Sequence, residues 1–194
     1  MRDLVFHRYD AARARTVHDL VTGIYLDAYG KTIATGDPFQ TEEAFRRRLD
    51  AYTARDCFDL VIAYHEGEAI GQTFGWALPP PDGGWWRHLL TPVEPGWAEE
   101  DGHRTFALSE IMVRQAWTRR GVAHALHDEL LSTRPESRAT LLVRPSNITA
   151  YRAYAHWGWR KAAQLRNALP HAPLFDVLTL PLPLHPPDAS LQQR

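Results

Sequence analysis

The sequence predicts a single α/β domain, and three observations support this prediction. Its 194 residues suffice for one domain with a full core, and a hydrophobic content of 44% is ordinary for a globular protein. Apolar segments of strand-like and helix-like periodicity follow the order β-α-α-β-β-β-α-β-α-β-β. A strand that ends at Val113 leads through a short polar run into a helix that Gly121 opens.

The N-terminal part is predicted to form an edge strand and two helices. Residues 4–9 alternate as a strand does, and Asp10 can cap the helix that follows. The apolar stripe of this helix is expected to end near Gly30. A second helix begins near Thr41, and its arginines at 46–48 are interpreted as a solvated face.

A hairpin follows, with strands at 58–64 and 69–78. Gly71 and Gly75 lie inside its second strand, where glycine weakens pairing and gives no side chain to pack. These two glycines therefore indicate a β-bulge or a close approach of another backbone.

Composition and charge exclude several classes of protein. The single cysteine, Cys57, excludes an internal disulfide framework. A net charge of −1 gives no argument for a nucleic-acid partner, and no apolar run is long enough for a membrane span. The N-terminus has no signal-peptide core, so a cytoplasmic protein is expected.

The segment around Gly121 is a candidate phosphate site. A strand that turns into a helix exposes several backbone N–H groups at the helix N-terminus, and these groups and the helix dipole favour an anion. Gly121 permits close approach, and two arginines can pair with phosphate oxygens. A plain solvated helix start is the alternative for this loop taken alone. The candidate residues are Arg119, Arg120, Gly121, Val122 and Ala123.

A second motif lies about one helix and one strand further on. It consists of Asn147, Ala150, Tyr154, Gly158 and Trp159, at spacings of +3, +7, +11 and +12 from the asparagine. Together with Gly121-x-Ala123, this motif resembles the GNAT superfamily of N-acetyltransferases. One position departs from that family's loop pattern, because Thr118 stands where Gln or Arg is usual. The resemblance covers residues 58–180, and the earlier part agrees only in element order.

The resemblance implies a fold, a reaction and a cofactor. The fold is an α/β (α+β) GNAT-like domain at 1–180, with a mixed, mostly antiparallel central sheet flanked by four helices. The reaction is direct transfer of an acetyl group from acetyl-CoA to the amine of a small molecule in a ternary complex. Cofactor contacts are expected from the phosphate loop, from Asn147, which also caps its helix, and from the strand end at Ile111, Met112 and Val113.

Two residues are the candidates for catalysis. In the family, a tyrosine at the position of Tyr154 is the usual acid for the leaving thiolate. A phenol stays protonated at pH 7 and can donate such a proton; a packing role in the core is the alternative. Glu110 is the candidate general base or anchor for the substrate amine, and a strand-edge ion pair is its alternative. Strict alternation places Glu110 on the strand face opposite Ser109.

An insertion at about 79–104 interrupts the pattern and concentrates tryptophan. Trp85, Trp86, His88 and Trp97 are the candidates for substrate binding, as a wall or lid over an apolar or cationic group. The other interpretation, equally open, is a plug at one end of the core or a dimer contact. Residues 181–194 are read as a proline-rich tail.

Other functions stay open at this level. An acetyltransferase acting on a protein N-terminus or lysine would need a groove that a tryptophan lid opposes. A non-catalytic acyl-CoA-binding module is the second alternative, supported only by Thr118. His124 and His127 are spaced as a metal pair, but the sequence offers no third ligand, so no metal is predicted. GNAT-like domains are often dimers, which leaves a homodimer open.

Overall fold

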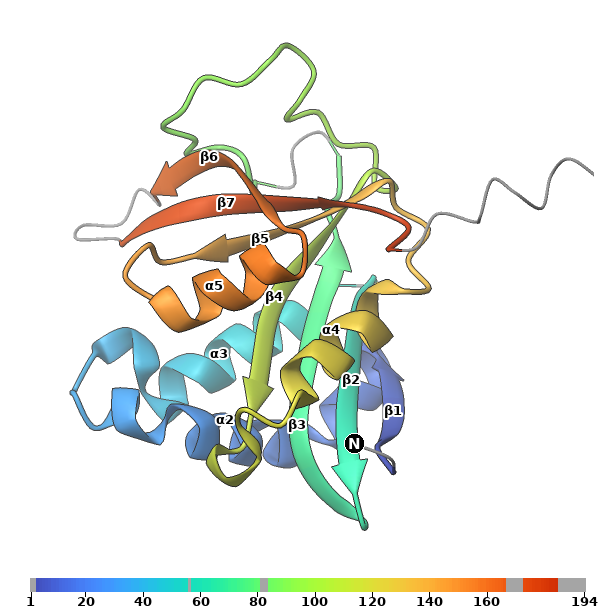
Figure 1. Ribbon diagram of the computed structural model, residues 1–194, viewed down its shortest axis with the longest axis vertical. Coiled ribbons are helices and arrows are strands. Elements are labelled where there is room, and N and C mark those ends of the chain that lie inside the picture. The colour runs from blue at the N-terminus through green and yellow to red at the C-terminus, as the bar shows by residue number, and fades with distance from the viewer. Residues whose placement is uncertain (1–2, 56, 81–83, 167–172, 185–194) are drawn as a thin grey trace, which may run out of the picture. The chain divides into compact units, whose positions relative to one another are not determined.

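The fold contains a mixed sheet whose seven strands follow the order β1-β2-β3-β4-β5-β7-β6 (Figure 1). A computed structural model describes residues 3–55, 57–80, 84–166 and 173–184. The β1–β2, β2–β3, β5–β7 and β6–β7 pairs are antiparallel, whereas β4 and β5 are parallel. This confirms the predicted mixed, mostly antiparallel sheet. The strands are β1 (Val5–Asp10), β2 (Phe58–His65), β3 (Glu68–Ala77), β4 (Thr105–Val113), β5 (Arg138–Val143), β6 (Arg160–Arg166) and β7 (Leu174–Pro181).

The described residues form five α-helices, one more than the predicted four, because the first predicted helix is broken at Val17. Val17 leaves helical geometry with φ −113° and ψ 19°. The second piece continues past Gly30 to Ile33, and Gly36, with φ 76°, follows it. The predicted helix end at Gly30 was therefore wrong, and the glycine in the left-handed region comes six residues later. The helices are α1 (Ala11–Thr16), α2 (His18–Ile33), α3 (Glu42–Thr53), α4 (Val122–Leu131) and α5 (Ile148–His156).

The chain divides into two compact units. The first unit comprises Met1–Trp76 and Leu108–Leu130, and the second comprises Ala77–Ala107 and Leu131–Arg194. The strand β4 contributes its first three residues to the second unit and the remainder to the first. The predicted division into a domain at 1–180 and a tail stays a prediction, and residues 185–194 of that tail lie outside the described part of the chain.

The first unit packs the apolar faces of α2 and α3 in an aromatic core. Tyr25 and Phe45 are almost completely buried, and their rings stack with centroids 3.9 Å apart. Side-chain caps begin two of the helices. Asp10 accepts from the Arg13 amide, as predicted, and Thr41, where the second helix was predicted to begin, accepts from the Ala44 amide. These local signals explain why the helix starts were easier to predict than the helix ends.

Gly71 lies on β3 where the backbone of β4 comes close to it. The β2–β3 register shifts between Ala63 and Tyr64, opposite Gly71, which confirms the predicted bulge. A Cβ atom on Gly71 would lie 2.9 Å from the Met112 carbonyl oxygen and 3.1 Å from Leu126 Cδ1. The predicted close approach of another backbone is therefore also present, and only glycine fits there.

In the second unit, the insertion covers the free edge of β6. Leu89 pairs with Leu165, the Leu90 amide donates to the Gln164 carbonyl at 2.8 Å, and the Arg166 amide donates to the His88 carbonyl at 3.2 Å. An uncovered edge strand invites pairing with another chain, so this segment protects the sheet on that side.

We expect Gly71→Ala to lower the free energy of unfolding by about 1–3 kcal/mol, because the methyl group overpacks against backbone atoms that cannot move independently. Gly23→Ala is the matched control, since nothing lies within 4 Å of its Cβ position in α2. That substitution should leave stability unchanged or raise it by up to about 1 kcal/mol. Chemical denaturation measures both variants, and equal effects would contradict the close approach at Gly71.

Candidate active site

Glu110 lies on β4 in the first unit, in surroundings that remove most of its water. The side chain is half-buried, Tyr29 on α2 donates a hydrogen bond to its carboxylate, and the Arg48 guanidinium of α3 is near enough to act on its charge. Burial dominates and raises the pKa of Glu110 to about 7, while Arg48 and Tyr29 oppose that rise. A carboxyl with this pKa can accept a proton near neutral pH, as the predicted base requires.

Two further tyrosines belong to the same environment. Tyr52 on α3 is hydrogen-bonded to Ser109, and burial raises the pKa of its phenol. The charge of Glu110 raises the pKa of both Tyr52 and Tyr25 further. Tyr52 therefore interacts with both Ser109, through a hydrogen bond, and Glu110, through its charge. Strict alternation places these two neighbours on opposite faces of the strand.

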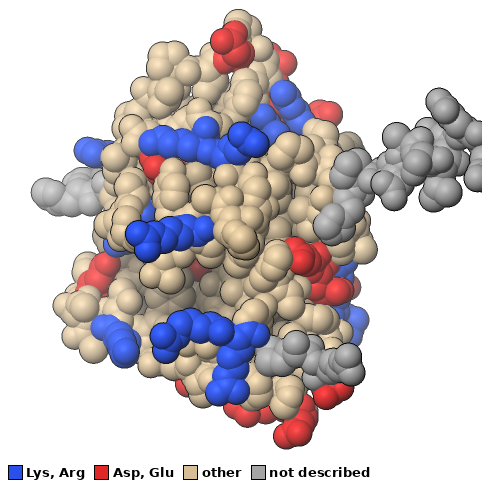
Figure 2. Space-filling model, in the orientation of Figure 1, with Lys and Arg blue, Asp and Glu red and all other residues tan. Residues whose placement is uncertain are grey.

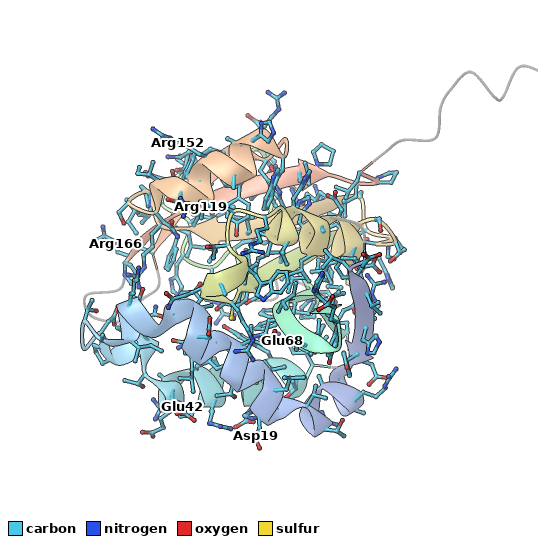
Figure 3. All side chains as sticks on the ribbon, turned by 60° about the horizontal axis from the view of Figure 1, so that its bottom comes forward. Asp19, Glu42, Glu68, Arg119, Arg152 and Arg166 are labelled. Carbon is cyan, nitrogen blue, oxygen red and sulfur yellow. The ribbon has the colours of Figure 1, made fainter. Side chains whose placement is uncertain are left out.

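Sequence analysis did not single out Tyr29 or Tyr52 as neighbours of this strand, nor Arg48 as a charge that acts on Glu110. Arg46 and Arg47 do face solvent, where they pair with acidic residues within 2.9 Å. In Figure 3 two of the acidic partners, Asp19 and Glu42, lie on the outer side of α2 and α3. Arg48 is half-buried, as Arg46 is, and donates to the Phe39 carbonyl at 2.7 Å. One residue along a helix is about 100°, which is enough to separate Arg48 from its neighbours.

The end of β4 carries the predicted contacts for the cofactor's amide arm. Met112 is buried, and Ile111 and Val113 are half-buried. The Gln72 side chain donates to the Met112 sulfur at 3.4 Å and to the Val21 carbonyl at 3.0 Å. These contacts fix the side chain of Met112, and the binding role of the three strand residues stays a prediction.

The predicted phosphate loop forms a tight turn before α4. Arg119 has φ 60° and Gly121 has φ 81°, so two residues out of three adopt left-handed geometry. Such turns direct successive backbone N–H groups to one side, and the first N–H groups of α4 have no helical partner. Nothing lies within 4 Å of a Cβ placed on Gly121, so the space beside the loop is open. Figure 3 labels Arg119 at this turn.

Thr118, the departure from the family's loop pattern, has a structural role. Its hydroxyl donates to the Gln115 carbonyl at 2.9 Å and closes the short 3-10 helix Gln115–Trp117. The Arg120 guanidinium lies 5.1 Å from the centre of the Trp117 ring. The Thr118 hydrogen bond and the contact between Arg120 and Trp117 thus stabilise the turn. Its backbone geometry therefore needs no Gln or Arg at position 118.

The second motif begins and ends α5 in the second unit. The Asn147 side chain accepts from the Ala150 amide at 3.2 Å, which confirms the predicted cap. Gly158, with φ 91°, ends the helix and returns Trp159 to pack edge-on against Tyr154, with ring centroids 6.1 Å apart. Tyr154 itself is half-buried. Three of the motif residues therefore position the tyrosine that is predicted to be the acid.

The tryptophans of the insertion pack around a cation in the second unit. The Arg138 guanidinium lies 5.5 Å from the Trp86 ring centre and 4.5 Å from that of Trp97. The Trp86 indole N–H donates to Glu100 at 2.9 Å, and Arg138 also donates to that carboxylate at 3.1 Å. Trp85 packs edge-on against Trp86. This packing supports the core-plug interpretation of these residues, and substrate binding by Trp85, Trp86, His88 and Trp97 stays a prediction.

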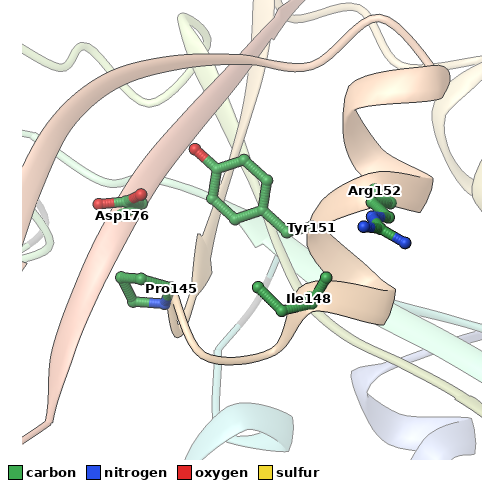
Figure 4. Close-up of a pocket in the computed structure, with 5 residues that line it drawn as sticks. All are labelled: Pro145, Ile148, Tyr151, Arg152 and Asp176. Atoms are coloured by element: carbon green, nitrogen blue, oxygen red, sulfur yellow. The ribbon is translucent and has the colours of Figure 1, made fainter.

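Sequence reasoning also missed a cavity of about 390 Å³ in the second unit (Figure 4). Its buried carboxylate, Asp176, lies 2.7 Å from Lys161 Nζ and accepts from Gln164 at 2.9 Å. Burial alone would raise the pKa of Asp176, but these partners outweigh burial and lower it. Asp176 is therefore satisfied within the protein. The lining residues are Pro145, Ile148, Tyr151, Arg152 and Asp176.

Comparison with known proteins identifies the family. The sequence profile of the Acetyltransferase (GNAT) family matches residues 21–159. This range is more than half of the chain, so the chain belongs to the GNAT family of acetyltransferase enzymes. A search among curated protein sequences found no match.

Solved structures share the fold at low sequence identity. An acetyltransferase from Thermus thermophilus is 14% identical with a TM-score of 0.63, over 93% of this chain and 97% of the other. A GNAT acetyltransferase from Elizabethkingia anophelis with acetyl-CoA bound is 14% identical with a TM-score of 0.60, over 94% and 100%. The ribosomal-protein-S18-alanine N-acetyltransferase from Escherichia coli is 17% identical with a TM-score of 0.59, over 92% and 93%. At these identities the likeness shows the fold alone.

The surface and the helices add two general findings. Among the helices of the described residues, none combines the length and apolarity needed to span a membrane. Basic and acidic side chains both appear on the face in Figure 2.

Glu110→Gln tests the buried carboxyl through stability. With its pKa raised to about 7, neutral Glu110 stabilises the fold fully below the pKa of about 4.3 that it has when unfolded, and this stabilisation is lost as pH rises through about 7. The variant should therefore be more stable than the wild type at pH 8 by about 1–3 kcal/mol, with a smaller difference at pH 4.

Urea unfolding at the two pH values measures this difference. Glu68→Gln, at the exposed first residue of β3, is the control, with little change expected at either pH. A Glu110→Gln difference that does not depend on pH would contradict the raised pKa.

Proposed function

We propose that this protein is an acetyl-CoA-dependent N-acetyltransferase that acetylates the amine of a small molecule by direct attack in a ternary complex. The observation that carries the proposal is Glu110, whose pKa of about 7 suits a general base at neutral pH. An alkylammonium group has a pKa of about 10.4, so its attack on an acyl group needs such a base.

The cofactor assignment rests on the loop before α4 and on family membership. Left-handed geometry at Arg119 and Gly121, and the open space beside Gly121, fit a group that accepts several backbone N–H bonds, as a pyrophosphate does. The Elizabethkingia anophelis relative was solved with acetyl-CoA bound, which agrees with this assignment. Arg119, Arg120, Gly121, Val122 and Ala123 would hold the pyrophosphate, and Ile111, Met112, Val113 and Asn147 the amide arm.

In the proposed mechanism, the protein moves two protons and orients one carbonyl. Acetyl-CoA supplies the thioester whose acyl carbon the amine attacks. The Glu110 carboxylate takes the proton of the amine, and Tyr29 holds the carboxylate in place. The Met112 N–H would be the donor for the negative charge that develops on the thioester oxygen. The Tyr154 phenol would donate its proton to the departing thiolate, since a phenol is protonated at neutral pH.

The surroundings of Glu110 favour a compact amine as the acceptor. The carboxyl is half-buried, and Tyr29 and Tyr52, which are also half-buried, belong to the same environment. Aromatic faces and one carboxylate together suit a small cationic amine. The alternative acceptor is a protein N-terminus or lysine; the Escherichia coli relative is named for alanine acetylation of a ribosomal protein. A non-catalytic module remains the third alternative, although Thr118, its only support, has a structural explanation.

Thermal shifts with acetyl-CoA, CoA and ATP as separate ligands test the cofactor first. At a hundredfold excess over Kd, one-site binding adds about 2.7 kcal/mol, which corresponds to a rise of about 5–10 °C for a chain of this size. We expect this rise with both CoA species and not with ATP. CoA release is then followed with small amines and with peptides; turnover confined to peptides would overturn the small-molecule assignment, and turnover with neither, despite binding, would support the non-catalytic module.

Tyr154→Phe tests the proposed acid. Turnover should fall by about ten- to a thousandfold while the affinity for acetyl-CoA stays unchanged, because only the phenolic proton is removed. Tyr151→Phe on the same helix is the matched control and should retain turnover. Steady-state kinetics and a binding titration separate the two effects. Unchanged turnover in Tyr154→Phe would remove this residue from the mechanism.

A further inference from the structure

The helix α4 presents three side chains that the proposed mechanism does not use. His124, His127 and Asp128 each offer one possible metal-ligand atom, and these atoms lie within 4.8 Å of one another. All three belong to the first unit, on the helix drawn in yellow in Figure 1. The sequence showed the two histidines as a pair without a third ligand. Helical geometry supplies that ligand, because residues at i, i+3 and i+4 share one face.

The separations between these atoms suit a coordination sphere. Asp128 Oδ1 lies 2.8 Å from His127 Nδ1 and 3.5 Å from His124 Nε2. Bonds of about 2.0–2.1 Å to a transition metal place two ligand atoms about 2.9 Å apart at a right angle and about 3.4 Å apart at the tetrahedral angle. Both separations are thus close to ones that a bound metal requires, and small side-chain rotations would bring all three atoms onto one ion.

We propose that His124, His127 and Asp128 form a binding site for a divalent transition-metal ion of the zinc type. Two imidazoles and one carboxylate favour Zn²⁺, Co²⁺ or Ni²⁺ over Mg²⁺ and Ca²⁺, which prefer oxygen ligands alone. Three protein ligands on one helix leave at least one coordination position for water.

The environment of each ligand agrees with this role. Only 2% of the His127 side chain is exposed, so the surrounding packing holds its ring in place. His124 and Asp128 are 50% and 45% exposed, which gives an ion access from solvent. The positive end of the helix dipole and the nearby Arg119 and Arg120 oppose a cation, so we expect affinity severalfold below that of a similar site elsewhere on a helix.

This inference does not rest on the proposed function, and its test measures metal binding directly. Metal-free, tag-free protein is titrated with Co²⁺, whose visible absorption reports ligand type, and then with Zn²⁺ in a calorimeter. One ion per chain is expected. His124→Ala and Asp128→Asn should each weaken binding by about tenfold or more, the usual effect of losing a ligand or its support. His156→Ala, an exposed histidine on α5, is the matched control and should bind as the wild type does.

The outcomes are distinguishable even if one variant is unstable. His124 is exposed, so His124→Ala should keep the wild-type melting temperature without metal. Saturable binding that His124→Ala abolishes and His156→Ala retains supports the site. The proposal is overturned by the absence of saturable binding to the wild type. It is equally overturned if His124→Ala binds the metal as the wild type does, or if His124→Ala and His156→Ala weaken binding to the same extent. In either case the Asp128 carboxylate would serve only to orient the two imidazoles.

Discussion

The contact between β3 and β4 at Gly71 is the constraint on which the candidate active site depends. The Met112 carbonyl comes so close to Gly71 that a Cβ atom would lie 2.9 Å from it. This approach sets the distance between β3 and β4 at Gly71. The same short stretch of β4 carries Glu110 and the predicted cofactor contacts. Leu126 of α4 packs at the same point, so the position of the helix that follows the phosphate loop also depends on this contact. The absence of a side chain at Gly71 therefore permits the packing of both β4 and α4 against β3.

Glu110 shows how the first unit would exchange stability for the reactivity that we propose. Desolvation makes the ionised carboxylate unfavourable, and the hydrogen bond from Tyr29 and the charge of Arg48 recover only part of that loss. Complete compensation would leave an ordinary carboxylate, too weak a base to take a proton from an amine. Without any compensation the carboxyl would stay protonated at neutral pH. The intermediate result, a pKa of about 7, is the range in which a base is both ionised and effective.

The parts of this molecule that the sequence predicted are those with a local physical cause. Asn147 caps α5 and Gly71 marks a bulge because the reason for each residue type lies within a few positions of it or in its own backbone. Arg48 and Tyr29 could not be predicted in the same way. They reach Glu110 from α3 and α2, more than sixty residues away in the chain, and only the packing of those helices decides which residue of an arginine run turns inward. The insertion was undecided for the same reason, since tryptophan composition does not tell a lid from a packed cluster.

The helix α4 combines preferences for opposite charges within two turns. Its first N–H groups and its dipole favour an anion at its first turn, which includes Ala123, while Asp128 in the second turn favours a cation. Each residue advances a helix by about 1.5 Å, so these two sites are separated by less than about 10 Å along the axis. A cation bound at His124, His127 and Asp128 would offset the charge of the carboxylate and strengthen the field that attracts a pyrophosphate. Because coupling between two binding sites is reciprocal, the pyrophosphate would strengthen the binding of the cation by the same factor. The two proposals for α4 therefore do not compete; occupation of either site favours the other.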